Sequence, residues 1–197
     1  NHDVLILGDC EVYENISTVT MWENYGISSY IRGSAEQLIW QSYYLLEDTL
    51  KYEKPQVVIV NVLAMTQRDA KSEAYNRMTL DGMKLSKYKI ASIRESMTEE
   101  ENMASYIFPL LRYHSRWSEL SSEDFRYMWK TPSVTTNGYL MQKGVRPVTT
   151  IPKAAPLANY TFSDRNMEYL DKIYSLCKDN GINLVLMKAP SVYPHWY

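Results

Sequence analysis

The chain has 197 residues, of which 45% are hydrophobic and 22% charged, and its formal net charge is −2. This composition is that of one globular domain with a substantial core, and it excludes a disordered chain. Without a basic excess, no nucleic-acid partner is expected. No apolar run reaches the roughly 18 residues that a membrane-spanning helix needs.

Only two cysteines are present, Cys10 and Cys177. Two are too few for a disulfide scaffold, and neither has a cysteine or histidine at metal-ligand spacing, so no metal and no other cofactor are expected. The chain also has 17 tyrosines against 3 phenylalanines. Tyrosine suits wet, half-buried surfaces such as glycan sites. A general compositional bias explains the same count.

In chain order, the first 63 residues predict strand, connection, strand, helix and strand. The expected strands are apolar or β-branched segments at residues 4–7, 26–31 and 56–63. Ser34 with Gln37 three residues later forms a capping box, which predicts that the helix between the last two strands begins there. Helices alternating with buried strands predict an α/β layer architecture with a parallel sheet.

The middle of the chain, residues 64–150, changes character. It is polar, rich in methionine and tyrosine, and mostly helical in pattern, with a second capping box at Thr98 and Glu101. We interpret it as a mostly helical insertion that lies over the sheet and forms one wall of a cleft. The α/β pattern then resumes with a helix capped by Ser163 and stopped by Gly181, followed by a buried strand at 182–187. Residues 1–197 are therefore predicted to form a single domain.

Ligands of open parallel sheets bind at the carboxyl ends of the strands. The segments 8–13, 31–37, 61–67 and 188–195 follow the expected strands, so candidate site residues are sought there. Gly8-Asp9-Cys10 comes directly after the first strand. This tripeptide resembles the SGNH/GDSL hydrolase family, which carries Gly-Asp-Ser at this place.

The resemblance implies a flavodoxin-like three-layer α/β/α fold and assigns Cys10, beside Asp9, the position of the nucleophilic serine. A thiol can replace a hydroxyl as nucleophile, and a helix N-terminus favours the thiolate. The alternative is a buried and inert cysteine. Gly33 is similar to the glycine whose backbone N–H stabilises the family's oxyanion. The alternative for Gly33 is an ordinary turn glycine.

Two further blocks of the family match less well. Asn61 is the candidate for the third block, with Gln67 as a substitute donor, although a structural hydrogen bond explains Asn61 better. The closing Asp-x-x-His motif is absent, because none of the three histidines (His2, His114 and His195) has an aspartate three residues before it. We expect the sheet to be incomplete at the C-terminus, with the catalytic histidine beyond Tyr197. The abrupt opening on a strand suggests that a segment precedes Asn1.

Longer segments, at residues 25–37, 113–120 and 137–147, are similar to bacterial SGNH-like proteins of the cell envelope. That resemblance implies an extracytoplasmic domain, anchored to the membrane only through a segment absent from this chain, whose partner is an envelope glycan or an acyl donor. Arg32 and Glu36 would contact the substrate beside Gly33. His114, Arg116 and Trp117 would contact a sugar or an anion, or they form a local structural network.

Two functions follow from these residues. In the first, the protein is an esterase or O-acyltransferase of a cell-envelope polysaccharide, with Cys10 attacking an acyl carbonyl and the N–H groups of Cys10 and Gly33 holding the oxyanion. In the second, it is a catalytically inactive glycan-binding or assembly domain. The cysteine in place of serine and the neighbouring Glu11, whose charge disfavours a thiolate, support the second. A redox role for Cys10 is weaker, because Cys177 is expected to point into the core.

Overall fold

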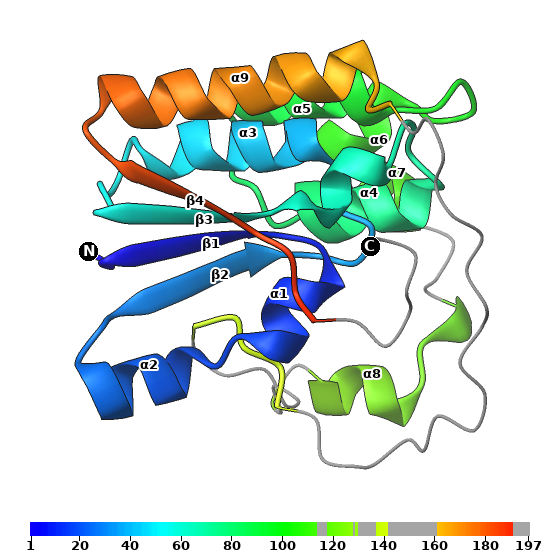
Figure 1. Ribbon diagram of the computed structural model, residues 1–197. Helices are drawn as coiled ribbons and strands as arrows, with labels where there is room; N and C mark the ends of the chain where they lie inside the picture. Colours follow the sequence, from blue (N-terminus) through cyan, green and yellow to red (C-terminus); the bar gives the residue numbers. More distant parts are fainter. Residues whose placement is uncertain (114–117, 128, 130–136, 142–160, 191–197) are drawn as a thin grey trace, which may run out of the picture.

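A parallel sheet forms the centre of the molecule (Figure 1). The structure, a computed structural model, describes residues 1–113, 118–127, 129, 137–141 and 161–190. The strands of the described residues are β1 (Val4–Gly8), β2 (Ser29–Gly33), β3 (Val57–Asn61) and β4 (Asn183–Met187). They pair in the order β2-β1-β3-β4, and every pair is parallel. The predicted α/β fold with a parallel sheet is confirmed.

Helices cover both faces of this sheet. On one face lie α3 (Ile39–Thr49), α5 (Lys87–Ser96) and α9 (Asp164–Asp179), and on the other lie α1 (Cys10–Asn15) and α2 (Thr18–Tyr25) (Figure 1). The described residues between β3 and α9 add η1 (Val62–Thr66), α4 (Glu73–Leu80), α6 (Met103–Ile107), α7 (Leu110–Tyr113) and α8 (Ser122–Tyr127). The result is the three-layer α/β/α arrangement. No helix in the described residues is both long and apolar enough to cross a membrane.

The core explains why the strands are apolar without interruption. Successive side chains of a strand point to opposite faces. Leu5 and Leu7 therefore join the core beneath α3 and α9, whereas Val4 and Ile6 join a smaller core with Val12 of α1. Since both faces of β1 are covered by helices, both sets of side chains must be apolar.

The helix expected at Ser34 begins later than its capping box predicts. Glu36 has a left-handed backbone, with φ of 57°, so residues 34–37 form a turn and α3 starts at Ile39. The Ser34 hydroxyl donates to Gln37 at 3.3 Å and also bonds Thr79 of α4. The predicted cap is wrong because a tertiary partner, Thr79, and its own turn engage the Ser34 side chain.

A second predicted cap fails in a similar way, while a third is confirmed. Thr98 donates its N–H and hydroxyl to Glu101, at 3.2 and 2.9 Å, but α6 starts only at Met103, behind Asn102 as its N-cap. Ser163 does cap α9, because its hydroxyl accepts from the N–H of Asn166 at 3.2 Å.

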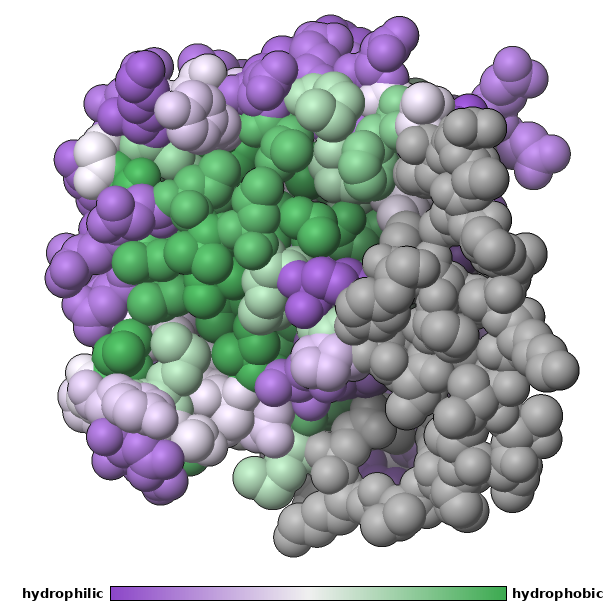
Figure 2. Space-filling model, viewed as in Figure 1, coloured by the Kyte–Doolittle hydropathy of each residue, from purple (hydrophilic) through white to green (hydrophobic). Residues whose placement is uncertain are grey.

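β4 is found where the sequence predicts it, but it is not buried. Among the described residues it pairs only with β3, and its Val185 and Leu186 are 44% and 49% exposed. Figure 2 shows apolar side chains gathered on this face of the molecule, where β4 runs at the front in Figure 1. The expected burial of this strand is therefore wrong, because β4 is an edge strand of the described sheet.

Candidate functional site

The candidate site lies where the carboxyl ends of β1, β2 and β3 meet. Gly8 and Gly33 are partners in the register of β1 and β2, and Asn61 ends β3 on the other side of β1. The chain passes from β1 to β2 on one side of β1, and then from β2 to β3 on the other side of β1. The connections therefore diverge at this edge of the sheet. Such switch points are where open α/β sheets bind their ligands. Cys10 starts α1 at this edge.

The two glycines allow the backbone segments to approach very closely here. A Cβ on Gly33 would lie 2.5 Å from Cγ2 of Val12 and 3.0 Å from the carbonyl oxygen of Gly8. A Cβ on Gly8 would lie 2.6 Å from Cβ of Asn61. The N–H of Ser34 also donates to the Gly8 carbonyl at 3.3 Å. The loop after β2 is thereby packed against the start of α1, and no side chain fits between them.

Asp9 and Cys10 both lie in surroundings that disfavour negative charge. Asp9 is buried, and its Oδ1 caps α1 by accepting from the N–H of Glu11 at 3.0 Å. Burial, followed by the charges of Glu11 and Glu36, raises the pKa of Asp9 to about 6. Cys10 is partly exposed; burial and then the charges of Asp9 and Glu14 raise the pKa of its thiol to about 11. At neutral pH Cys10 is therefore a protonated thiol.

Asn61 is held in a network with Glu11 and Lys188. The buried Asn61 amide donates to Oε2 of Glu11 at 2.8 Å, and its Oδ1 accepts from the N–H of Leu63 at 2.7 Å. Lys188 donates to Oε1 of the same Glu11 at 2.7 Å. Lys188 was missed as an individual residue in the sequence. The signal that could have found it is its position directly after the last strand.

A second set of hydrogen bonds crosses this edge of the sheet and joins Glu36 to Gln67. Gln67 donates to Oε2 of Glu36 at 2.5 Å, and Lys71 donates to Oε1 at 2.6 Å. The loops after β2 and β3 are therefore joined at the side chain of Glu36. In this arrangement one N–H of the Gln67 amide is donated to Glu36.

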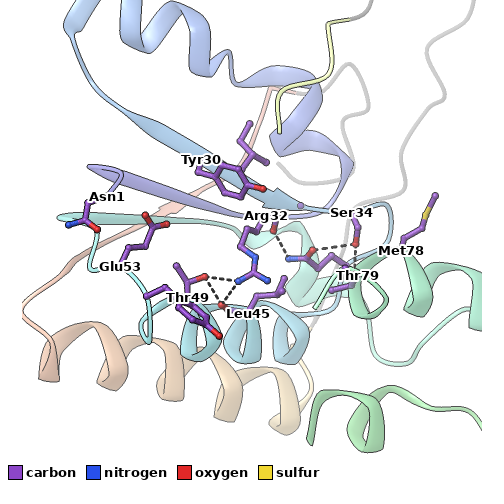
Figure 3. A pocket seen from close by; sticks show the side chains of 14 residues that line it. Asn1, Tyr30, Arg32, Ser34, Leu45, Thr49, Glu53, Met78 and Thr79 are labelled. Carbon is purple, nitrogen blue, oxygen red and sulfur yellow. Dashed lines mark hydrogen bonds between the residues drawn. The ribbon is translucent and has the colours of Figure 1, made fainter. Parts of the chain in front are cut away.

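Arg32 points towards α3 (Figure 3). Its Nη1 donates to the carbonyl of Leu45 at 3.2 Å and to the Thr49 hydroxyl at 2.8 Å, and it lies 3.5 Å from Oδ2 of Asp48. Arg32 lines a cleft of about 530 Å³ on the α3 side of β2. A smaller cavity of about 330 Å³, next to Tyr13 and Ala35, shares Gly33 and Ser34 with this cleft.

The remaining predicted site residues, His114, Arg116 and Trp117, lie outside the described residues, as does His195. In the described part of the chain the histidine is His2, which contacts Glu53 at 2.9 Å near the amino ends of the strands. That part of the chain holds no cluster of three or more histidine, cysteine, aspartate or glutamate side chains suited to a metal ion.

Cys177 is 1% exposed in the core beneath α9. It is a free thiol, as is Cys10, and burial raises its pKa to about 11. Its position agrees with the expected structural role and gives Cys10 no resolving partner.

Comparison with protein-family models, with curated proteins and with solved structures finds no match to this chain. What the site does is therefore to be read from its own residues: a cysteine at a helix start, two closely packed glycines, and a set of carboxylates balanced by Lys71 and Lys188.

Proposed function

We propose that the protein is an SGNH-like esterase or O-acyltransferase that acts on a cell-envelope polysaccharide outside the cytoplasm, with Cys10 as its nucleophile. The observation that supports this most is the position of Cys10. It opens α1 directly after a buried central strand, at the sheet edge where Gly33 approaches the backbone of residues 8 and 9. Nucleophiles of α/β enzymes are held at such strand ends.

The proposed chemistry has two steps. The Cys10 sulfur attacks the acyl carbonyl, the N–H groups of Cys10 and Gly33 stabilise the oxyanion, and the alcohol leaves with a proton while a thioester forms. Water or an acceptor hydroxyl then attacks the thioester and regenerates the thiol. Because the pKa of the thiol is raised to about 11, a base must accept its proton during the attack. The histidine expected beyond Tyr197 stays a prediction for this role.

Intact-mass measurement with p-nitrophenyl acetate tests this proposal in the full-length natural protein. An acetyl adduct should appear on the wild type and then clear. Cys10→Ala should show none, whereas Cys177→Ala, which removes the other thiol, should behave like the wild type. A folded wild-type protein that acquires no adduct, or an adduct that persists in Cys10→Ala, would contradict the role of Cys10.

Two observations favour the second candidate, a catalytically inactive glycan-binding or assembly domain. The Asn61 amide donates to Glu11, and burial, together with three nearby carboxylates, raises the pKa of the Cys10 thiol so that it stays protonated. Neither group is then poised for acyl transfer. On this alternative, glycan binding is unaffected by Cys10→Ala and no ester is turned over.

A further inference from the structure

The cleft beside β2 exists because the helices leave one strand partly uncovered. β2 stands at the end of the strand order in the described residues, next to β1, and α3 packs against β1, α5 and α9. On the α3 side, β2 presents Tyr30 and Arg32 to a gap bounded by the second half of α3 and the end of α4 (Figure 3). The volume, about 530 Å³, lies within the range of roughly 300–1,000 Å³ that small-molecule sites occupy.

Most of the polar side chains that line this cleft carry hydroxyls or amides. The hydroxyls are those of Tyr30, Ser34, Thr49, Tyr52 and Thr79, and the amides are those of Asn1 and Gln37. The Gln37 amide and the Thr49 hydroxyl already donate their hydrogens within the protein, so they offer acceptor lone pairs to the hydroxyls of a ligand. The tyrosine hydroxyls of Tyr30 and Tyr52 are of a type that can both donate and accept. Tyr52 is 64% exposed, and a tyrosine ring offers an apolar face together with a polar end.

The two charged side chains that line the cleft already have partners. Arg32 is bonded to Leu45 and Thr49 and lies near Asp48. Glu53 accepts from the N–H of His2 at 3.2 Å and lies 2.9 Å from its ring nitrogen Nδ1. An ionic ligand would have to compete with these partners, whereas an uncharged ligand would not. The remaining N–H groups of Arg32 can still donate to neutral oxygen atoms.

Several lining groups are fixed by bonds behind the cleft. The Gln37 amide donates to the Arg32 carbonyl at 3.2 Å and to the Ser42 hydroxyl at 2.9 Å. The Thr79 hydroxyl bonds Ser34 and donates to Gln41 at 3.3 Å. Side chains that are already ordered lose less conformational entropy when a ligand binds.

The cleft also leads to the candidate site. It runs beside β2 from Gly33 and Ser34 to Tyr52 and Glu53. The length of β2, Ser29–Gly33, corresponds to roughly 13 Å at about 3.3 Å per residue. A chain of sugar rings in the cleft would bring one end to the edge where Cys10 and Gly33 lie.

We infer that this cleft binds an uncharged, hydroxyl-rich chain, namely a neutral oligosaccharide. The inference deepens the proposed function and rests on it only for the step that brings the reacting end of the glycan to Cys10. The binding itself depends on the lining of the cleft: hydroxyls, exposed tyrosine and charges that already have partners.

Titration of the protein with three neutral tetrasaccharides (cellotetraose, chitotetraose and mannotetraose) and with anionic tetragalacturonate tests the inference. At least one neutral sugar should bind and should shift the backbone amide resonances of residues 30–34 and 49–53. Tyr52→Ala should weaken this binding by about fivefold, the loss expected for one aromatic contact. Tyr25→Ala is the matched control, because Tyr25 is 73% exposed on α2, away from the cleft, and should leave the affinity unchanged.

Three results would overturn the inference: no neutral sugar binding at about 10 mM, which is weaker than any useful affinity; stronger binding of tetragalacturonate; or equal effects of Tyr52→Ala and Tyr25→Ala. The acetyl-adduct experiment needs no glycan, so the two proposals fail separately. An adduct on Cys10 without sugar binding would support acyl transfer and contradict glycan binding in the cleft. Sugar binding that is unchanged in Cys10→Ala, with no acetyl adduct on the wild type, would support glycan binding in the cleft and contradict acyl transfer.

Discussion

At Cys10, the local environment shifts the pKa in the direction opposite to the one expected from the residue's position at a helix start. A cysteine at a helix start suggests a thiolate, because the helix dipole favours negative charge there. The structure partly buries the thiol, and the charges of Asp9, Glu14 and Glu11 add to the effect of burial. The pKa of the thiol rises to about 11 as a result.

Alkylation with iodoacetamide should report this raised pKa directly. The rate for Cys10 should climb steadily from pH 7 to above pH 10, because only the thiolate reacts. Asp9→Asn keeps a good helix cap and removes one negative charge, so the rate at pH 8 should rise by roughly two- to tenfold. Glu23→Gln, on α2, is the control and should leave the rate unchanged. Equal rates in the wild type and Asp9→Asn would show that the Asp9 charge does not act on the thiol.

Asp9 should also make the stability depend on pH in an unusual direction. Its pKa is about 6 in the folded protein and 3.8 in an unfolded one, so the folded state binds the proton more tightly. The free energy of unfolding should therefore fall as pH rises from about 4 to about 6. Asp9→Asn should remove this dependence and should be more stable at pH 7, by at most about 3 kcal/mol. Urea unfolding at several pH values measures both effects.

Asp3 is the matched comparison, because its pKa is shifted the other way. Hydrogen bonds from the Ser28 side chain and backbone lower the pKa of Asp3. The stability that Asp3 contributes is present above its unfolded pKa and is lost as pH falls through the lower folded value. Asp3→Asn should therefore be less stable than the wild type at pH 7. If both variants shifted stability in the same direction, the assignment of the Asp9 effect to burial would be contradicted.

At the scale of elements, the contact between β2 and α1 depends on Gly33. Its backbone does not need a left-handed conformation, so the requirement for glycine comes from space alone. Gly33→Ala should lower the free energy of unfolding by about 1–3 kcal/mol, as overpacking does, because its Cβ would lie 2.5 Å from Val12.

The control for Gly33→Ala is Gly82→Ala. A Cβ on Gly82 would have Thr79 as its nearest neighbour, at 3.9 Å, so this change should be neutral or slightly stabilising. Urea unfolding followed by circular dichroism measures both variants. A Gly33→Ala protein as stable as Gly82→Ala would mean that the loop after β2 can move away from α1.

Helix starts were predicted less well than strands, and the reason is physical. A strand such as β3 is predicted by a run of β-branched residues, because its buried place in the sheet requires them. A capping residue only offers a hydroxyl, and that hydroxyl bonds whichever partner the fold provides. The Ser163 hydroxyl accepts from the N–H of Asn166, whereas the Ser34 hydroxyl bonds that of Thr79, 45 residues away on α4.

At the scale of the whole molecule, the described sheet ends in an exposed strand. β4 pairs on one side in the described residues, and its Val185 and Leu186 are about half exposed. Figure 2 shows apolar side chains gathered on the face where β4 runs. An apolar, unpaired strand edge favours association between chains. Val185→Lys should therefore lower the self-association of the 197-residue chain, measured by sedimentation velocity over a range of concentrations.

Val19→Lys is the control for this change. Val19 is 38% exposed on α2, so the variant adds the same charge away from β4. It should change self-association little, because the unpaired edge of β4 stays apolar. Equal reductions in both variants would mean that net charge, rather than the β4 edge, governs association.

The sequence by itself determined the α/β class, the parallel sheet, three of the strands to within two residues, and α9 with its cap at Ser163. The second strand, expected at 26–31, is Ser29–Gly33 in the structure. These features depend on which residues must be buried, and burial leaves a periodic pattern along the chain. The sequence also predicted that Asp9, Cys10, Gly33 and Asn61 lie at one edge of the sheet, because the carboxyl ends of parallel strands lie at the same edge.

Only the tertiary structure decided what those residues contact. Glu11 accepts from Lys188, 177 positions away in the sequence, and Arg32 donates to the carbonyl of Leu45 on α3. The cleft beside β2 likewise depends on how far α3 and α4 cover that strand. Pairings of this kind leave no local pattern, because a polar side chain is satisfied by any partner that the fold brings within hydrogen-bonding distance.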